Sequence, residues 1–224
     1  MKQTYLYDRL MNLPLFQGIG RSDFYEMVER IRLGFRRQPK GYFYVRQDET
    51  CNSLRFIMDG EVCVHQESLE HNFTLSEWLS FPMVIQPECL FGLSTRYTRS
   101  FQAVSMLQTL EIDKASVRDV LFLYPTFQIN FLNMISTRAQ YVSKIQGRLP
   151  SDSLYGRFLN LVSERCIHPA GHKEIKIGMN TLSDYLYTSR LGVSKMLNQL
   201  ANENKIILNR EHIIIPKFEL LLNS

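Results

Sequence analysis

The 224-residue sequence predicts an α+β protein: an N-terminal antiparallel β-roll, a long helix, and a smaller C-terminal module of helices and a hairpin. Two observations favour this order. Residues 41 to 112 alternate short aromatic and β-branched runs with turn residues, which is typical of a small antiparallel barrel or sandwich. Residues 126 to 147 instead have one long helical periodicity. The predicted divisions are 1–125, 126–150 and 151–224.

The composition is that of a globular protein with one large domain or two small ones. Hydrophobic residues make up 45% of the chain, which is enough for such cores. The amino terminus lacks the apolar core of a signal peptide, and no apolar run approaches the ~20 residues of a membrane helix. We therefore expect a cytoplasmic protein with no membrane partner. The cysteines are scattered, which favours buried free thiols over a disulfide frame: Cys51, Cys63, Cys89 and Cys166.

Short strands are expected through the N-terminal half, after a helical segment over residues 4 to 33. The first run covers residues 41–45, and two more cover 54–58 and 61–64. Asp59-Gly60 lies between the last two and is a strong hairpin signal. Further strands are expected at 73–78, 83–85 and 101–112. Together they predict the roll.

An apolar stripe follows the long helix over residues 126 to 147, with Arg138 interrupting it. Its members recur at heptad-like intervals: Phe127, Phe131, Met134, Tyr141 and Ile145. A narrow stripe of this kind is typical of a coiled coil, so it predicts a homodimer interface on this helix. The alternative is packing against the chain's own strands, which would need a broader apolar face. Residues 147–153 then predict a hinge.

The C-terminal stretch predicts two short helices joined by a brief turn. The first carries Leu182 and Leu186, and Ser189 begins the second. The second helix has an apolar face and a polar, basic outer face. A helix of this size fits the DNA major groove, which is about 12 Å wide, with its first residues against the base edges. The candidate DNA-binding residues are Thr188, Ser189, Arg190, Leu191, Ser194 and Lys195.

These candidates differ in the contact that each could make. Arg190 is on the first turn and could donate to guanine O6 and N7, whereas Lys195 and the hydroxyls suit phosphates, which carry no sequence information. Residues 206–216 then place two β-branched runs around a polar turn, so a hairpin is expected with Arg210 and His212 at its tip. Such a hairpin would be the wing of a winged helix-turn-helix.

Over nearly its full length, the chain resembles the cyclic-AMP receptor protein and FNR (Crp-Fnr) family of bacterial transcription regulators. The resemblance rests on the order and spacing of residues 13–19, 40–44, 54–62 and 91–92, and on Ser189-Arg190 followed by Val193, Lys195 and Leu197. It implies a cyclic-nucleotide-binding-like jelly roll, a dimerisation helix and a winged helix-turn-helix. It also implies a homodimer on a double-stranded DNA operator, under the control of an effector that the sequence does not identify. RNA polymerase is a further candidate partner.

The resemblance places an effector site at Gly92, Arg99 and Ser100. Family members that bind cyclic AMP have a glutamate after the glycine, for the ribose hydroxyl, and an Arg-Ser pair for the phosphate. Here Leu93 follows Gly92, so we expect an effector other than cyclic AMP. A plain surface position is the alternative for Arg99. Leu191 stands where several relatives have a glutamate that reads cytosine; leucine could contact a thymine methyl instead.

The sequence contains little evidence for catalysis or for a metal site. No catalytic motif is present, so an enzyme is not expected, and no cofactor is assigned. Cys166, His168 and His172 offer only three zinc ligands, and a surface loop is the preferred interpretation. The alternative function is a ligand-binding or protein-interaction module of cyclic-nucleotide-binding fold without DNA-binding activity. Salt dependence of duplex binding distinguishes the two.

Overall fold

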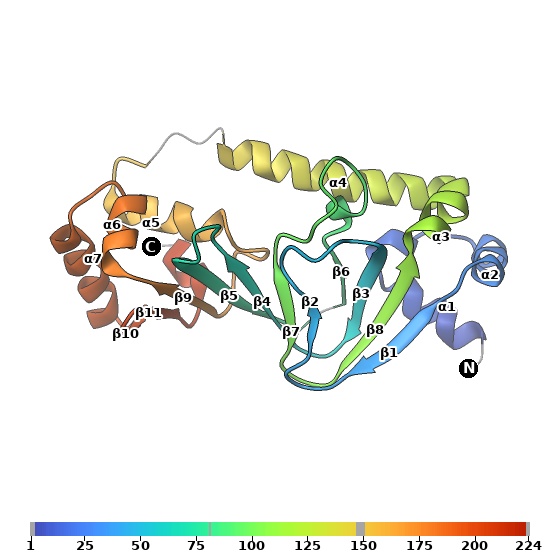
Figure 1. Ribbon diagram of the computed structural model, residues 1–224, viewed down its shortest axis with the longest axis horizontal. Coiled ribbons are helices and arrows are strands. Elements are labelled where there is room, and N and C mark those ends of the chain that lie inside the picture. The colour runs from blue at the N-terminus through green and yellow to red at the C-terminus, as the bar shows by residue number, and fades with distance from the viewer. Residues whose placement is uncertain (1–2, 81, 147–150, 223–224) are drawn as a thin grey trace. The chain divides into compact units, whose positions relative to one another are not determined.

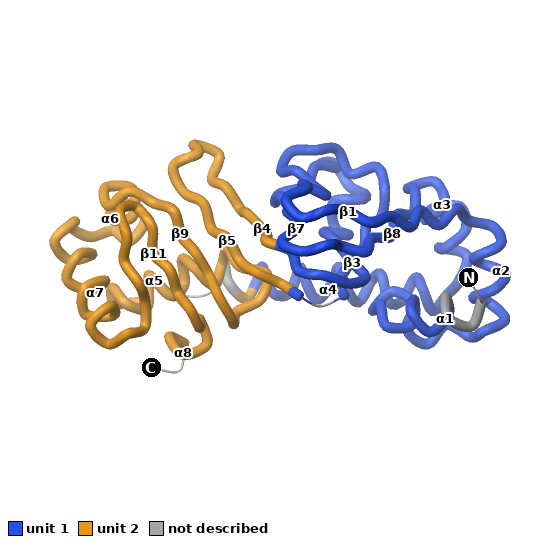
Figure 2. Tube along the Cα trace, turned by 90° about the horizontal axis from the view of Figure 1, so that it is seen from below, with its two compact units in different colours: residues 1–62, 80–143 blue, residues 63–79, 144–224 orange. Residues whose placement is uncertain are grey.

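The computed structural model describes residues 3–80, 82–146 and 151–222, and the chain forms two compact units. Unit 1 consists of residues 1–62 and 80–143, and unit 2 of residues 63–79 and 144–224 (Figure 2). Unit 2 therefore combines the C-terminal stretch with a segment from the N-terminal half. Among the helices of the described residues, none combines the length and apolar character needed to span a bilayer.

Unit 1 is built around antiparallel strands with helices at both ends of its sequence. One sheet has the strand order β1 (Gly34–Gln38), β8 (Leu107–Asp113), β3 (Ser53–Asp59) and β6 (Met83–Ile85). Outside this sheet, β2 (Phe43–Val45) pairs with β7 (Ser100–Ala103). The helices are α1 (Gln3–Met11), η1 (Pro14–Phe16), α2 (Arg21–Arg30), η2 (Pro87–Cys89), α3 (Lys114–Asp119), η3 (Leu121–Leu123) and the long α4 (Pro125–Gln146) (Figure 1).

The prediction of a hairpin at Asp59-Gly60 is wrong. Strand β3 pairs with β8 and β6, whereas β4 (Val62–Glu67), which follows the dipeptide, lies beside β5 (Phe73–Leu79) in another sheet. Gly60 has a φ of +104°, and a Cβ on it would meet the Met106 carbonyl oxygen at 2.6 Å. Asp59-Gly60 is thus a corner where the chain leaves one sheet for another, and glycine is required there by a close approach of backbone.

In its described residues, unit 2 consists of strands and four helices around an apolar core. The strand order is β10 (Ile207–Asn209), β11 (His212–Ile215), β9 (Lys173–Ile177), β5 and β4. The helices are α5 (Leu154–Ser163), α6 (Met179–Tyr185), α7 (Arg190–Asn202) and α8 (Phe218–Leu222). Strand β9 was not expected from the sequence. The predicted hinge residues 147–150 lie outside the described residues.

The interpretation of Phe127 and Phe131 as dimer-interface residues needs correction. Phe127 is fully buried, with its ring 5.7 Å from that of Phe16 and 5.9 Å from that of Phe122. Phe131 is 8% exposed and contacts the rings of Phe91 and Phe122. These side chains belong to the core of unit 1, so the start of the stripe packs on the chain's own domain. Met134 and Tyr141 are partly exposed, and the side chain of Ile145 is not among those described.

The four cysteines are free and buried, as expected. Burial raises the pKa of Cys63 to about 12 and that of Cys89 to about 11. Because the thiolate is the reactive form, these two thiols are poor nucleophiles at neutral pH.

Candidate nucleic-acid interface

Two helices and the turn between them form the helix-turn-helix that the sequence predicts. Ser189 is the N-cap of α7, and its hydroxyl accepts a hydrogen bond of 3.2 Å from the Gly192 amide. The turn before it is held from α5, where Arg157 Nε donates to the Leu186 carbonyl at 2.9 Å. Tyr187, in this turn, has a φ of +48°. The start of α7 is therefore fixed by a local cap and by a contact with a neighbouring helix.

Helix α7 has one buried and one exposed face, with the residues distributed as the periodicity predicts. Val193, Leu197 and Leu200 lie in the core of unit 2. Arg190, Leu191 and Lys195 are exposed, and Leu191 retains 65% of its accessible surface. The Leu191 side chain is thus accessible to solvent next to Arg190.

A groove of about 580 Å³ lies between α7, the start of α6 and the β10–β11 hairpin. From α7 it is lined by Arg190 and Ser194, and from the hairpin by Arg210 and His212. Half of the predicted DNA-binding residues thus come together on one concave surface of unit 2. The other half, Thr188, Ser189, Leu191 and Lys195, do not line this groove.

The β10–β11 hairpin is the predicted wing, with a small difference at its tip. Asn209 and His212 are paired across the hairpin, so the turn itself is Arg210-Glu211. His212 is the first residue of β11 rather than part of the tip. The hairpin is held to β9 by a hydrogen bond of 2.9 Å from the Ile177 amide to the Glu211 carbonyl.

The exposed cations of this surface are not matched by nearby carboxylates among the described residues. Within the described part of the chain, no carboxylate forms an ion pair with Arg190, Lys195 or Arg210. Basic residues outnumber acidic ones in residues 144–224 and balance them in 1–143, so the formal net charge of +4 lies in the C-terminal stretch. Arg190 and Arg210 line the groove and Lys195 lies outside it on the exposed face of α7, and cations exposed in this way suit a polyanionic partner.

Sequence reasoning left Asn180, Thr181 and Asn198 out of the candidate set, yet all three line the groove. Asn198 donates from Nδ2 to Ser194 Oγ at 3.3 Å, one helical turn earlier. The helical periodicity of the sequence already places Asn198 on the polar outer face of this helix, although not among the candidate DNA-binding residues. An asparagine amide can pair with adenine N6 and N7, so Asn198 adds a second group able to read a base edge.

The three predicted effector-site residues have different surroundings. Gly92 is exposed, with a φ of +95°, and Leu93 beside it is fully exposed. Arg99 is only 4% exposed, so the surface alternative for this arginine is wrong. The Ser100 hydroxyl accepts a hydrogen bond of 2.9 Å from the Gln47 amide. Ser100 therefore ties β7 to the segment that follows β2.

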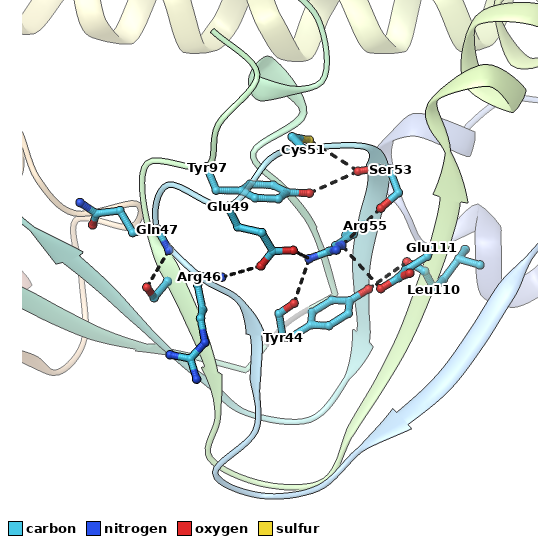
Figure 3. A network of polar contacts seen from close by, with 11 residues as sticks. Tyr44, Arg46, Gln47, Glu49, Cys51, Ser53, Arg55, Tyr97, Leu110 and Glu111 are labelled. Carbon is cyan, nitrogen blue, oxygen red and sulfur yellow. Dashed lines mark hydrogen bonds and ion pairs between the residues drawn. The ribbon is translucent and has the colours of Figure 1, made fainter.

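A polar network next to this segment surrounds Arg55 (Figure 3). The Arg55 guanidinium pairs with Glu49 at 2.9 Å and with Glu111 at 3.5 Å, and it lies 5.6 Å from the ring centres of both Tyr44 and Tyr97. Desolvation by burial strongly raises the pKa of both tyrosines. A cavity of about 500 Å³ beside the network is lined by none of the three predicted effector residues. The charge on Arg55 is already matched within the roll.

These positions give a testable expectation for cyclic AMP. Leu93 offers no acceptor for a ribose hydroxyl, and its side chain points into solvent. We expect no heat of binding when cyclic AMP is titrated into the protein in a calorimeter. A dissociation constant in the micromolar range or tighter would contradict this expectation.

The three residues considered for zinc have separate contacts. Cys166 is buried and donates to the Ser163 carbonyl, while the ring of His172 lies edge-on to Trp78 at 4.6 Å. No group of three or more potential ligands is arranged for a metal ion in the residues that the structure covers.

Comparison with known proteins bears on the fold. No protein-family model matches the chain, and no curated protein sequence matches it. The catabolite activator protein of Thermus thermophilus has 19% identity and a TM-score of 0.54, covering 94% of this chain and 97% of that one. CLP of Xanthomonas campestris, a c-di-GMP responsive global regulator, has 13% identity and a TM-score of 0.52. The match covers 88% of this chain and 99% of CLP. The predicted fold of β-roll, long helix and winged helix-turn-helix is confirmed.

Proposed function

We propose that the chain is a homodimeric, sequence-specific DNA-binding transcription regulator whose roll responds to an effector other than cyclic AMP. The observation that carries the proposal is the groove of unit 2, where α7 and the wing present Arg190 and Arg210 without carboxylate partners in the described residues. The fold shared with two transcription-related proteins supports it. RNA polymerase as a partner stays a prediction.

The proposed contacts follow from the exposed face of α7 and from the groove beside it. Helix α7 lies in the major groove with Arg190 at its first turn against the base edges, and Leu191 against a thymine methyl. The wing lies over the adjacent backbone, where Arg210 neutralises a phosphate. Lys195, on the exposed face of α7, neutralises another. Base-reading and phosphate-neutralising groups thus occupy different positions, which makes their roles separable by mutation.

The homodimer is proposed to form through the exposed face of α4. Ile129 and Leu132 retain 56% and 58% of their accessible surface. Ser136, Ala139 and Ser143 continue the same face at the three- and four-residue alternation of a heptad, and all are exposed. Small residues in the second half allow two helices to approach closely. Two copies would place their α7 helices on half-sites one helical turn apart, roughly 34–36 Å centre to centre.

The proposal is tested by the salt dependence of binding to a DNA duplex. We expect the logarithm of affinity to fall steeply and linearly with the logarithm of salt concentration, because each neutralised phosphate releases counterions. Arg210→Ala should make the slope shallower by about 1 for each protomer, the value of one phosphate contact. Lys217→Ala is the matched control: this exposed lysine follows β11 at the end away from the wing turn and does not line the groove.

Two results would contradict the proposal. A flat salt dependence for the wild type would favour the alternative, a ligand-binding or protein-interaction module without DNA-binding activity. Equal slopes for wild type and Arg210→Ala, with a reduced slope for Lys217→Ala, would place the DNA on another surface.

A further inference from the structure

Strand β5 lies in the N-terminal half of the sequence but is built into the sheet that carries the wing. It pairs with β9 in an antiparallel register that runs from Phe73 opposite Ile177 to Glu77 opposite Lys173. Strand β9 pairs in turn with β11, one of the two wing strands. In the sheet of unit 2, only β9 separates the β4–β5 hairpin from the wing (Figure 1).

The inward face of β5 shares a core with α7. Phe73 and Leu75 are each 1% exposed and belong to the same apolar cluster as Val193 and Leu197. The alternate residues of β5 are only partly buried. The hairpin therefore contributes to the core on which the proposed recognition helix packs, and it pairs with the strand that holds the wing.

Glu77 places a buried charge on this inward face, between Leu75 and Leu79. It is 2% exposed, and its carboxylate accepts hydrogen bonds from the Ile167 amide at 2.6 Å and the His168 amide at 3.1 Å. It also pairs at 3.3 Å with Lys173, which is fully buried and donates to the Ala170 carbonyl at 2.7 Å. Removing one partner of a buried ion pair leaves the other charge uncompensated, which is strongly unfavourable. Glu77 thus holds both the first residue of β9 and the loop before it.

We propose that Glu77 is a positioning residue for the wing, because it fixes the start of β9 and thereby the β10–β11 hairpin that β9 carries. The hairpin that bears Glu77 continues into unit 1 at Val62 and Ser80. The part of the proposal that concerns DNA rests on the proposed function, whereas the part that concerns β9 does not.

The first experiment measures amide hydrogen exchange of the full-length protein by mass spectrometry. In Glu77→Gln we expect exchange to be about 10-fold faster or more in the loop 167–170, β9 and β11, and unchanged in β3 and β8. Thr74→Ala is the matched control, since Thr74 is on the same strand with its side chain on the other face. Equal exchange in Glu77→Gln and the control would overturn the proposal.

A second variant separates positioning from a failure to fold. Glu77→Gln combined with Lys173→Met removes both charges, keeps an oxygen that accepts from one of the two loop amides and fills the space of the lysine stem. We expect this double variant to recover most of the protection of β9 and β11, because a buried pair can be replaced by neutral groups of similar shape. If the double variant exchanges as fast as Glu77→Gln alone, the ion pair is not what positions β9.

The second experiment asks whether Glu77 acts through the wing on DNA. Arg210→Ala should weaken duplex binding in the wild type, but should have no further effect in the Glu77→Gln background, where the wing is already displaced. Additive effects would show that Glu77 acts elsewhere and would overturn the proposal. If Arg210→Ala has no effect in the wild type, the proposed DNA contact of the wing is wrong, and the exchange measurement still decides the role of Glu77.

Discussion

Arg190→Ala is expected to abolish the sequence preference of the protein at one base pair of each half-site. Arg190 is the first residue of α7, exposed, and on the groove shared with the wing. Losing a bidentate contact with guanine should cost about 1–3 kcal/mol per half-site. For a dimer with two independent half-sites, affinity should fall by roughly one and a half to four orders of magnitude. The measurement is selection of bound duplexes from a random library.

Lys195→Ala provides the comparison. Its side chain is exposed on the same helix but does not line the groove. A phosphate contact carries no sequence information, so this variant should bind all duplexes more weakly and select the same motif as the wild type. Neither change touches the buried face of α7, so both proteins should fold. An unchanged motif at wild-type affinity for Arg190→Ala would show that α7 does not read DNA in the proposed way.

The other large effect is expected on α4. Changing Ile129 and Leu132 together to glutamate places four like charges at the proposed two-fold interface, because each copy contributes two. Both side chains are more than half exposed in the single chain, so the fold of unit 1 should survive. We expect monomers by sedimentation, and a duplex affinity reduced to that of a single half-site, since the second site no longer benefits from effective concentration.

Thr137→Glu is the control for this experiment. Thr137 is exposed on α4 but lies off the row formed by Ile129, Leu132, Ser136 and Ala139. The control should remain dimeric. Dimers of the glutamate double variant at micromolar concentration would mean that the copies associate through another surface.

Local signals in the sequence were sufficient to predict the helix-turn-helix and the wing. Ser189 is a strong N-cap residue, and it is the N-cap of α7. The β-branched runs on either side of Arg210 form the two expected strands. The capping interaction and the hairpin both join residues that are close in sequence, so the residue pattern alone contained the information.

The errors concern contacts between distant segments. Helix α4 has two apolar faces, and periodicity does not specify which partner each face contacts. Phe127 and Phe131 were therefore assigned to a second copy, although they pack inside unit 1 and Ile129 and Leu132 are the exposed pair. Likewise Asp59-Gly60 has the composition of a hairpin turn, but the strands on its two sides do not pair with each other. Strand β3 pairs with β8 and β6, and β4 lies beside β5.

Strand β9 has a sequence pattern from which it could have been predicted. Residues 173–177 alternate polar and apolar side chains, and their burial alternates in the same way. This alternation predicts a strand, yet it does not predict that the partner is β5, whose Glu77 is 96 residues from Lys173. The charges on both residues even argue against burial when each is considered alone. Only their pairing makes the buried position favourable.

The discontinuity of unit 2 has a consequence for how the protein is made. During synthesis, β5 leaves the ribosome long before β9 has been translated. Until then the apolar residues of β5 are not yet covered by the core of unit 2, and the edge that will pair with β9 has no hydrogen-bond partner. An unpaired strand edge with apolar residues is a template for wrong pairing with other chains. Long-range antiparallel pairing also slows folding, because a large loop must close before the contact forms. The β4–β5 hairpin is therefore exposed to wrong pairing in the interval between its own translation and the translation of residues 173–177.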